Sequence, residues 1–121
     1  MWAFACDMNP KTDGYENANI SHVYQHWSQA DKSPMPFLFL DVRTPEEFGA
    51  GHIPGAINIS LQTLPERLNE LPKDKQLYVY CRSGNRSTKA SKLLADAGFK
   101  HVENFKDSMN GWLAAKYPVE K

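Results

Sequence analysis

Residues 80–87 read Tyr-Cys-Arg-Ser-Gly-Asn-Arg-Ser, and they contain the side chains of this chain best suited to covalent chemistry. Cys81 directly follows an apolar segment that predicts a buried strand. Gly84 allows a tight turn with positive φ, and successive backbone N–H groups in such a turn can bind an anion. The helix expected from Ser87 adds its own N–H groups and dipole at the same point. We therefore expect the Cys81 sulfur to lie beside a cradle for negative charge.

Two arginines strengthen this expectation, because their positive charge favours a thiolate over a thiol. Together with the cradle they should lower the pKa of Cys81 below the roughly 8.5 of a free cysteine. The same cradle would hold an anionic substrate beside the sulfur. The alternative is a small buried cysteine in a plain turn, which has no need of two arginines and a glycine. The candidate site is the nucleophile Cys81 and an anion-binding loop of Arg82, Ser83, Gly84, Asn85, Arg86 and Ser87.

The elements that must position this loop alternate between strand and helix patterns. Strands are expected at 37–42, 56–59, 76–80 and 101–104. Helices are expected from a Ser21 cap to about Ala30, after Thr44, at 87–97 and at 109–116, and leucines at helical spacing surround Pro65. This alternation predicts an α/β domain with a mainly parallel sheet. Ligands of such sheets gather at the carboxyl ends of the strands, where Cys81 is placed.

Asp41 and Arg43 come at the end of the strand expected at 37–42 and so belong to the same edge. We expect them to support the Cys81 loop through hydrogen bonds and charge, with a purely structural ion pair as the alternative. Glu47 can complete a capping box with Thr44.

Other polar residues are interpreted as structural or left open. His52 is expected to form a structural hydrogen bond. His22 and His26 have the spacing of a metal half-site, but no further ligand cluster accompanies them. Lys89 and Lys92 either add to the positive field or belong to a solvated helix face.

Length and charge exclude several classes of function. The chain has 121 residues, enough for one domain, and its 14 basic and 14 acidic residues give a formal net charge of zero. A basic excess for nucleic acid or an anionic membrane surface is therefore missing. The longest strictly apolar run, residues 37–40, is far short of the ~20 residues of a membrane span. The sequence carries no signal of oligomeric state.

Residues 1–19 show no sustained periodicity and are interpreted as a flexible N-terminal leader, with the domain at 20–121. The expected location is the cytoplasm, or the periplasm if the leader is the stub of a trimmed export signal. Two cysteines are too few for a disulfide scaffold. Cys6 could resolve a modified Cys81 if the leader folds back.

Residues 81–87 resemble the active-site loop of the rhodanese superfamily, in particular its single-domain sulfurtransferases. Three further segments resemble that family in the same order: Asp41-Val42-Arg43 with Glu47-Phe48, then residues 51–58 (Gly-His-Ile-Pro-Gly-Ala-Ile-Asn), and Trp112. The resemblance covers roughly residues 20–117. One departure is Asp107-Ser108, which stands where many members have Gly-Gly. We expect Asp107 to be solvated at the rim of the site.

The resemblance implies a three-layer rhodanese-like domain, with a central sheet of about five strands flanked by helices. It also implies a sulfurtransferase of the thiosulfate:cyanide type. A small anionic donor, thiosulfate or a persulfide, would pass its sulfur to Cys81, and the Cys81 persulfide would pass it to cyanide, a thiol or a protein thiol. No metal or organic cofactor is implied.

Two alternatives share the fold. Phosphatases and arsenate reductases also use a cysteine and an arginine, but their loops are typically one residue longer than the four residues between Cys81 and Arg86. A non-catalytic rhodanese-like binding module usually lacks the cysteine, which this chain keeps. Sulfur transfer is therefore favoured.

Overall fold

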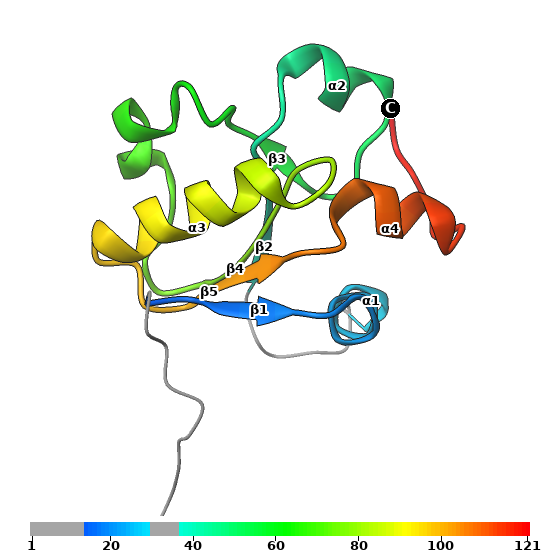
Figure 1. Cartoon of the computed structure of the whole chain (residues 1–121), viewed down its shortest axis with the longest axis horizontal. Coiled ribbons are helices and arrows are strands. Elements are labelled where there is room, and N and C mark those ends of the chain that lie inside the picture. Colours follow the sequence, from blue (N-terminus) through cyan, green and yellow to red (C-terminus); the bar gives the residue numbers. More distant parts are fainter. Residues whose placement is uncertain (1–13, 30–36) are drawn as a thin grey trace, which may run out of the picture.

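The computed structural model describes residues 14–29 and 37–121, and its centre is a sheet of five strands. The strands have the order β1-β5-β4-β2-β3, and every pairing is parallel (Figure 1). They are β1 (Glu16–Ala18), β2 (Phe37–Asp41), β3 (Ile57–Asn58), β4 (Gln76–Tyr80) and β5 (Val102–Phe105). This confirms the expected α/β fold with a parallel sheet of about five strands.

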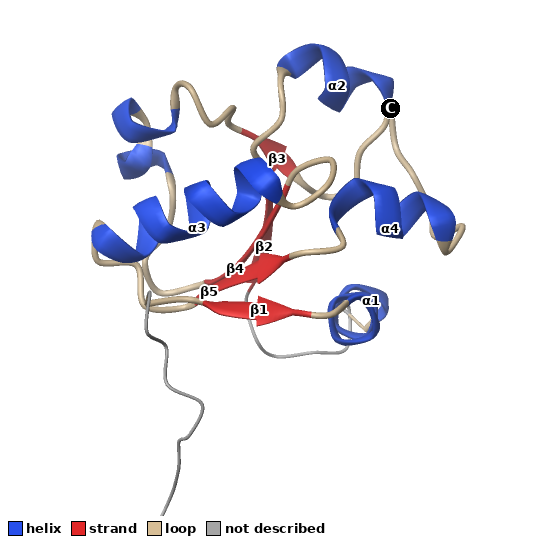
Figure 2. Cartoon of the chain, in the orientation of Figure 1, coloured by secondary structure: helices blue, strands red, loops and turns tan. Residues whose placement is uncertain are grey.

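Helices cover both faces of the sheet, which gives the three expected layers (Figure 2). They are α1 (Ile20–Ser28), α2 (Pro45–Ala50), α3 (Asn85–Asp96) and α4 (Ser108–Ala114), with two 3₁₀ helices, η1 (Leu64–Glu66) and η2 (Leu68–Glu70). One face packs against α3 and η1, and the other packs against α1 and α4. No helix in the described part of the chain is long and apolar enough to cross a membrane.

Strand β4 is buried on both faces because its alternate side chains enter two separate cores. Leu77 and Val79 pack in the core on the α3 side, and Tyr78 and Tyr80 pack in the core on the α1 and α4 side. Trp112 of α4 is fully buried in the second core. Burying each of these large side chains contributes about 1.5–3 kcal/mol. The two cores fix β4 from both sides, and Cys81 follows directly at its end.

The parallel register brings the ends of the strands to one edge. Asp41, the last residue of β2, is aligned with Tyr80, the last residue of β4. Ser108 begins α4 shortly after β5 ends at Phe105. Cys81, Asp41 and Ser108 therefore share the edge at which the sequence placed the chemistry.

The N-terminal boundary requires a correction. Strand β1 lies inside the segment interpreted as a leader, and it pairs with β5 at the edge of the sheet. Helix α1 also begins earlier than expected, because the side chain of Asn19, and not Ser21, accepts a hydrogen bond from His22 N–H and caps it. Ala30, Cys6 and the rest of residues 1–13 lie outside the described residues.

The leucine-rich segment 61–71 forms two 3₁₀ helices and not a regular α-helix. Their hydrogen bonds span three residues, as in Arg67 N–H to Leu64 O and Leu71 N–H to Leu68 O. Leu71 is extended because it precedes Pro72, and a residue before proline is disfavoured in the helical region. The leucine spacing thus predicted the buried side, but not the type of helix.

Candidate active site

The Cys81 sulfur lies inside the loop that joins β4 to α3, and only 1% of the residue is exposed. Its Sγ atom accepts hydrogen bonds from the backbone N–H of Gly84, with a donor–acceptor distance of 3.1 Å, and of Ser87, at 3.3 Å. Gly84 is the residue just before α3, and Ser87 lies in the first turn of α3. Backbone N–H groups at this end of a helix favour negative charge. Two backbone N–H donors therefore point at the sulfur, as the predicted anion cradle requires, and anion binding by the loop stays a prediction.

Gly84 is the residue on which the shape of the loop depends. Its φ is +102°, a left-handed conformation that favours glycine, and a Cβ here would lie 2.6 Å from the carbonyl oxygen of Lys106. The Gly84 carbonyl accepts hydrogen bonds from the hydroxyls of Ser87 (3.1 Å) and Thr88 (2.7 Å). These contacts hold the turn closed around the sulfur.

The pKa of the Cys81 thiol results from two opposing effects. Burial raises the pKa, while hydrogen bonds from Ser87, Gly84 and Ser83 lower it by more, so the pKa lies below the ordinary value of a cysteine. The pKa of Cys81 is thus lowered, as the sequence predicted, and the groups that lower it belong to the loop itself.

The guanidinium group of Arg86 is bound to the carboxylate of Glu47 in α2. The two guanidinium nitrogens of Arg86 contact the two carboxylate oxygens of Glu47 at 2.8 and 3.1 Å. Hydrogen bonding to Arg86 lowers the pKa of Glu47 to about 2, helped by the N–H of Thr44. The same carboxylate completes the expected capping box with Thr44. Glu47 therefore fixes both the start of α2 and the position of Arg86.

Asp41 and Arg43 form a buried ion pair with each other. Arg43 Nη2 lies 2.7 Å from Asp41 Oδ2 and donates to the carbonyl of Gly51 at the same distance. The Asn58 side chain donates to the carbonyls of Asp41 and Arg43, at 3.0 Å each. This network ties β2, β3 and the end of α2 together at the edge of the sheet. Asp41 and Arg43 thus form an ion pair, and their expected support of the Cys81 loop stays a prediction.

The remaining loop residues turn outward. Arg82, Ser83 and Asn85 are exposed, whereas Gly84 and Ser87 are buried beneath them. The structure thus brings Gly84 and Ser87 to the sulfur and leaves Arg82 at the rim.

Comparison of the sequence with models of known protein families shows which family this domain belongs to. A model of the rhodanese-like domain family matches residues 23–115, which include the Cys81 loop. The chain belongs to the rhodanese-like domain family.

Relatives of this rhodanese-like domain include proteins named as sulfurtransferases. The sulfurtransferase of Allochromatium vinosum is 37% identical over 82 residues, which cover 68% of this chain and 77% of that protein. The thiosulfate sulfurtransferase PspE of Escherichia coli is 41% identical over 68 residues, 54% of this chain and 65% of that protein. A rhodanese-related protein of Thermoplasma volcanium has a solved structure with a TM-score of 0.77 and 30% identity, covering 88% of this chain and 98% of that one. A sulfurtransferase role is therefore supported at the level of the family.

Ser108 occupies a special position in this rhodanese-like domain. It is buried, and its φ of +55° lies in the left-handed region that favours glycine. Its hydroxyl accepts from Cys81 N–H at 3.1 Å, donates to the carbonyl of Phe105 at 2.8 Å, and lies 3.9 Å from Sγ. Asp107 is exposed, as expected at the rim, and accepts a hydrogen bond from Ile20 N–H. The Ser108 hydroxyl thus holds the backbone of Cys81 in place through a hydrogen bond.

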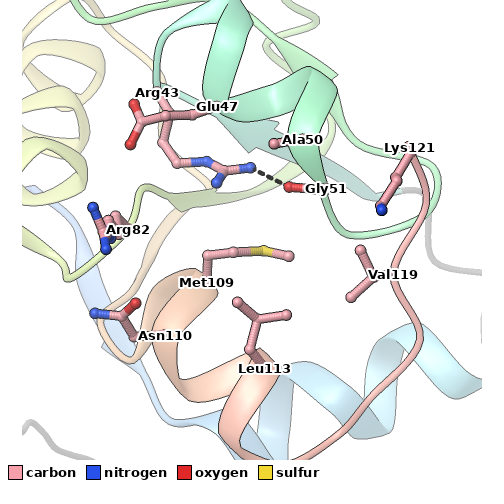
Figure 3. Close-up of a pocket in the computed structure, with 10 residues that line it drawn as sticks. All are labelled: Arg43, Glu47, Ala50, Gly51, Arg82, Met109, Asn110, Leu113, Val119 and Lys121. Carbon is pink, nitrogen blue, oxygen red and sulfur yellow. Dashed lines mark hydrogen bonds between the residues drawn. The ribbon is translucent and has the colours of Figure 1, made fainter.

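A pocket of about 400 Å³ opens beside the loop, between α2, α4 and the C-terminal segment (Figure 3). Met109, Leu113 and Val119 form an apolar part, and Arg82 and Lys121 lie at its sides. Such a volume lies at the lower end of the roughly 300–1,000 Å³ of small-molecule sites.

The histidines singled out from the sequence contact other parts of the fold and not the Cys81 loop. His52 is buried, its Nδ1 lies 2.8 Å from the carbonyl of Phe48, and its backbone pairs with Glu120. His26 contacts the Tyr78 hydroxyl, and burial lowers the pKa of His26. Among the residues described, no group of three or more His, Cys, Asp or Glu side chains is placed to hold a metal ion.

Two residues of the site were missed or underrated by sequence reasoning. Glu47 was assigned only to a helix cap, because nothing local indicates a partner 39 residues away. Ser108 was noted only as a departure from the family pattern, although a serine in place of glycine was the available signal. Both roles depend on contacts that only the folded sheet creates.

Proposed function

We propose that this protein is a sulfurtransferase that moves sulfane sulfur from thiosulfate or a persulfide donor to a thiophilic acceptor through a persulfide on Cys81. The observation that carries the proposal is the buried Cys81 sulfur, bound by the N–H groups of Gly84 and Ser87. These groups stabilise a thiolate before the reaction and an anionic persulfide after it.

The reaction consists of two displacements on sulfur. The Cys81 thiolate attacks the outer sulfur of thiosulfate, the S–S bond of thiosulfate breaks, and sulfite leaves with the bonding electrons. Cyanide or a thiolate then attacks the outer sulfur of the Cys81 persulfide, and the Cys81 thiolate returns as the leaving group. No net oxidation or reduction of the enzyme occurs, and ping-pong kinetics are expected.

The names of the relatives support this assignment, since the A. vinosum relative is a sulfurtransferase and PspE is a thiosulfate sulfurtransferase. The loop supports it independently. Four residues separate Cys81 from Arg86, and Arg86 is held by Glu47, so the cradle closes around one sulfur atom. Asp41 and Arg43 act in this proposal as supports of the edge and not as reacting groups.

The test is steady-state transfer from thiosulfate to cyanide by the purified protein, measured as thiocyanate formed. We expect parallel lines in double-reciprocal plots when both substrates are varied, and loss of transfer to background in Cys81→Ser. Circular dichroism of the variant serves as the control for folding. Transfer by Cys81→Ser, or turnover of an aryl phosphate in place of sulfur transfer, would contradict the proposal.

A further inference from the structure

A buried asparagine near the end of β5 connects the edge of the sheet to the start of α3. Asn104 is fully buried, and it lies opposite Asn17 of β1 in the register of the sheet. Its side-chain nitrogen donates to Asn17 Oδ1 and to Thr88 Oγ1, at 3.0 Å each. An asparagine amide carries two N–H donors, so both donors of Asn104 are used. Three elements that are distant in the sequence therefore meet at this side chain.

The oxygen of the same amide is buried without a hydrogen-bond partner among the residues that the structure describes. A buried acceptor without a partner costs stability, and an apolar side chain of similar shape would avoid that cost. The contacts that offset this cost are the two hydrogen bonds that Asn104 donates, one of them to Thr88.

From Thr88 the hydrogen bonds continue to the turn that holds the sulfur. The Thr88 hydroxyl donates to the carbonyl of Gly84 at 2.7 Å. Threonine in a helix often makes this bond to the carbonyl four residues earlier. A hydroxyl has a single hydrogen, and here the Thr88 oxygen also accepts from Asn104. Both ends of the hydroxyl are bound, so its orientation toward Gly84 is fixed.

Gly84 depends on such contacts because its own backbone does not select the conformation that the loop requires. Glycine adopts positive and negative φ about equally readily, whereas the loop needs a φ of +102°. The N–H of Gly84 donates to Cys81 Sγ at 3.1 Å. A change in the turn therefore changes the position of a donor that favours the thiolate.

From these contacts we propose that Thr88 and Asn104 are positioning residues, which hold the Gly84 turn in the conformation that stabilises the Cys81 thiolate. Both act through Gly84, and the donors to the sulfur remain the N–H groups of Gly84 and Ser87. The inference rests on the proposed function for its effect on sulfur transfer. Its effect on the thiolate can be measured without any sulfur donor.

The first experiment follows alkylation of Cys81 by iodoacetamide against pH in the full-length protein, read from the mass of the peptide that contains Cys81. Thr88→Val keeps the shape of the side chain and removes the hydroxyl, so the midpoint should move to higher pH. At a fixed pH below the midpoint the rate should fall about threefold, the effect of weakening one hydrogen bond. Thr88→Ser restores the hydroxyl and should return the native midpoint.

Thr63→Val is the matched control for this substitution. The Thr63 hydroxyl also donates to a backbone carbonyl, that of Ser60 at 3.2 Å, but Thr63 precedes η1 and is not part of the path to Gly84. Its alkylation midpoint should equal that of the native protein. A shift as large as that of Thr88→Val would overturn the inference.

A double-mutant cycle tests whether Asn104 acts through Thr88. Asn104→Ala should move the alkylation midpoint upward by less than Thr88→Val does, because the Thr88 hydroxyl remains. In the Thr88→Val background the same substitution should move the midpoint no further, since the path is already broken. Equal shifts in both backgrounds would overturn the path from Asn104 through Thr88.

The remaining outcomes separate a positioning role from a structural role, and the inference from the proposed function. If Thr88→Val and Asn104→Ala unfold at lower urea but keep the native alkylation midpoint, the two side chains only stabilise the fold and the inference is overturned. If Thr88→Val does not fold, the midpoint of Asn104→Ala decides alone. A native protein that forms no thiocyanate contradicts the sulfurtransferase, while shifted midpoints in the variants still support the positioning of Gly84.

Discussion

At the scale of single residues, the lowered pKa of Cys81 depends on hydrogen bonds from the loop more than on charged side chains. Ser87 and Gly84 contact the sulfur directly, whereas the guanidinium of Arg86 is bound to Glu47. The low pKa of Cys81 is therefore built into the turn. The arginines that pointed to an anion site in the sequence have other partners or face outward in the fold.

The pH dependence of alkylation tests this account of the sulfur. Because the pKa of Cys81 lies below its ordinary value, the rate of reaction with iodoacetamide should rise with a midpoint below the roughly 8.5 of a free cysteine. Arg86→Ala should shift that midpoint only slightly upward, since the backbone donors remain. A midpoint at or above 8.5 in the native protein would contradict the cradle.

Ser108 offers a second test at this scale. Ser108→Ala leaves the buried Cys81 N–H without its acceptor and keeps the left-handed backbone, so it should lower the free energy of unfolding by about 1–3 kcal/mol. Ser108→Gly loses the same hydrogen bond but relieves the backbone, and should be more stable than the alanine variant by about 1 kcal/mol. Urea denaturation measures both. An alanine variant as stable as the glycine variant would mean that the backbone at 108 is unstrained.

The sequence was sufficient to single out Cys81 as the candidate nucleophile, whereas the contacts around Cys81 were predictable only in part. Cys81 stands out because the strand, the glycine and the helix start are contiguous in the chain. Ser108 lies 27 residues from Cys81, so its hydrogen bond exists only once β4 and β5 are paired. The Asp41–Arg43 pair could be expected because its members are two residues apart, but its contact with the Gly51 carbonyl could not.

At the scale of elements, the β4–α3 turn should tolerate no side chain at Gly84. Gly84→Ala places a Cβ against the Lys106 carbonyl and forces alanine into a φ of +102°, so the free energy of unfolding should fall by about 2 kcal/mol or more. Gly49→Ala is the matched control, because Gly49 lies in α2 with open space around its Cβ position. That variant should be neutral or up to about 1 kcal/mol more stable. Equal losses in both variants, measured by urea denaturation, would remove the special role of the turn.

The contact between α2 and α3 predicts a dependence of stability on pH. The pKa of Glu47 falls from an ordinary 4.5 to about 2 in the folded protein, so its pairing with Arg86 stabilises the fold above pH 4.5 and is lost as the pH falls toward 2. Because both side chains are partly exposed, the effect should be at most about 1 kcal/mol.

The variant Glu47→Gln tests this effect, because the glutamine side-chain oxygen can retain the capping box. The variant loses the charge and the second oxygen that accepts from Arg86. We expect the native protein to lose more stability than the variant when urea denaturation is compared at pH 6 and pH 3. Identical losses in the two proteins would show that the ion pair contributes nothing to the fold.

The sequence predicted a strand correctly where an unbroken apolar segment is buried on both faces of the sheet. Residues 76–80 were predicted as β4 without error, because both faces of the strand are apolar and buried. Strand β1 was missed because Glu16–Ala18 has only Ala18 buried and forms by pairing with the edge of β5. The 3₁₀ helices were missed because leucine spacing indicates the buried side, whereas the prolines determine the backbone geometry.

At the scale of the whole molecule, a chain with zero net charge gathers backbone N–H donors around one buried cysteine. The sheet collects the ends of β2, β4 and β5 at one edge, where backbone N–H groups point at Cys81 and a pocket with an apolar floor opens beside it. The two cores on either side of the sheet hold this edge in place, and the Cys81 side chain is only one small member of the core on the α3 side. The site should therefore survive removal of the thiol: Cys81→Ala should keep the native fold.

The most direct test of the central claim is the intact mass of the purified protein before and after thiosulfate, and again after cyanide. The account predicts a gain of one sulfur atom with thiosulfate, its loss with cyanide, and no gain in Cys81→Ala. A protein that gains no sulfur from thiosulfate or from a persulfide donor, or that gains it equally without Cys81, would contradict the account.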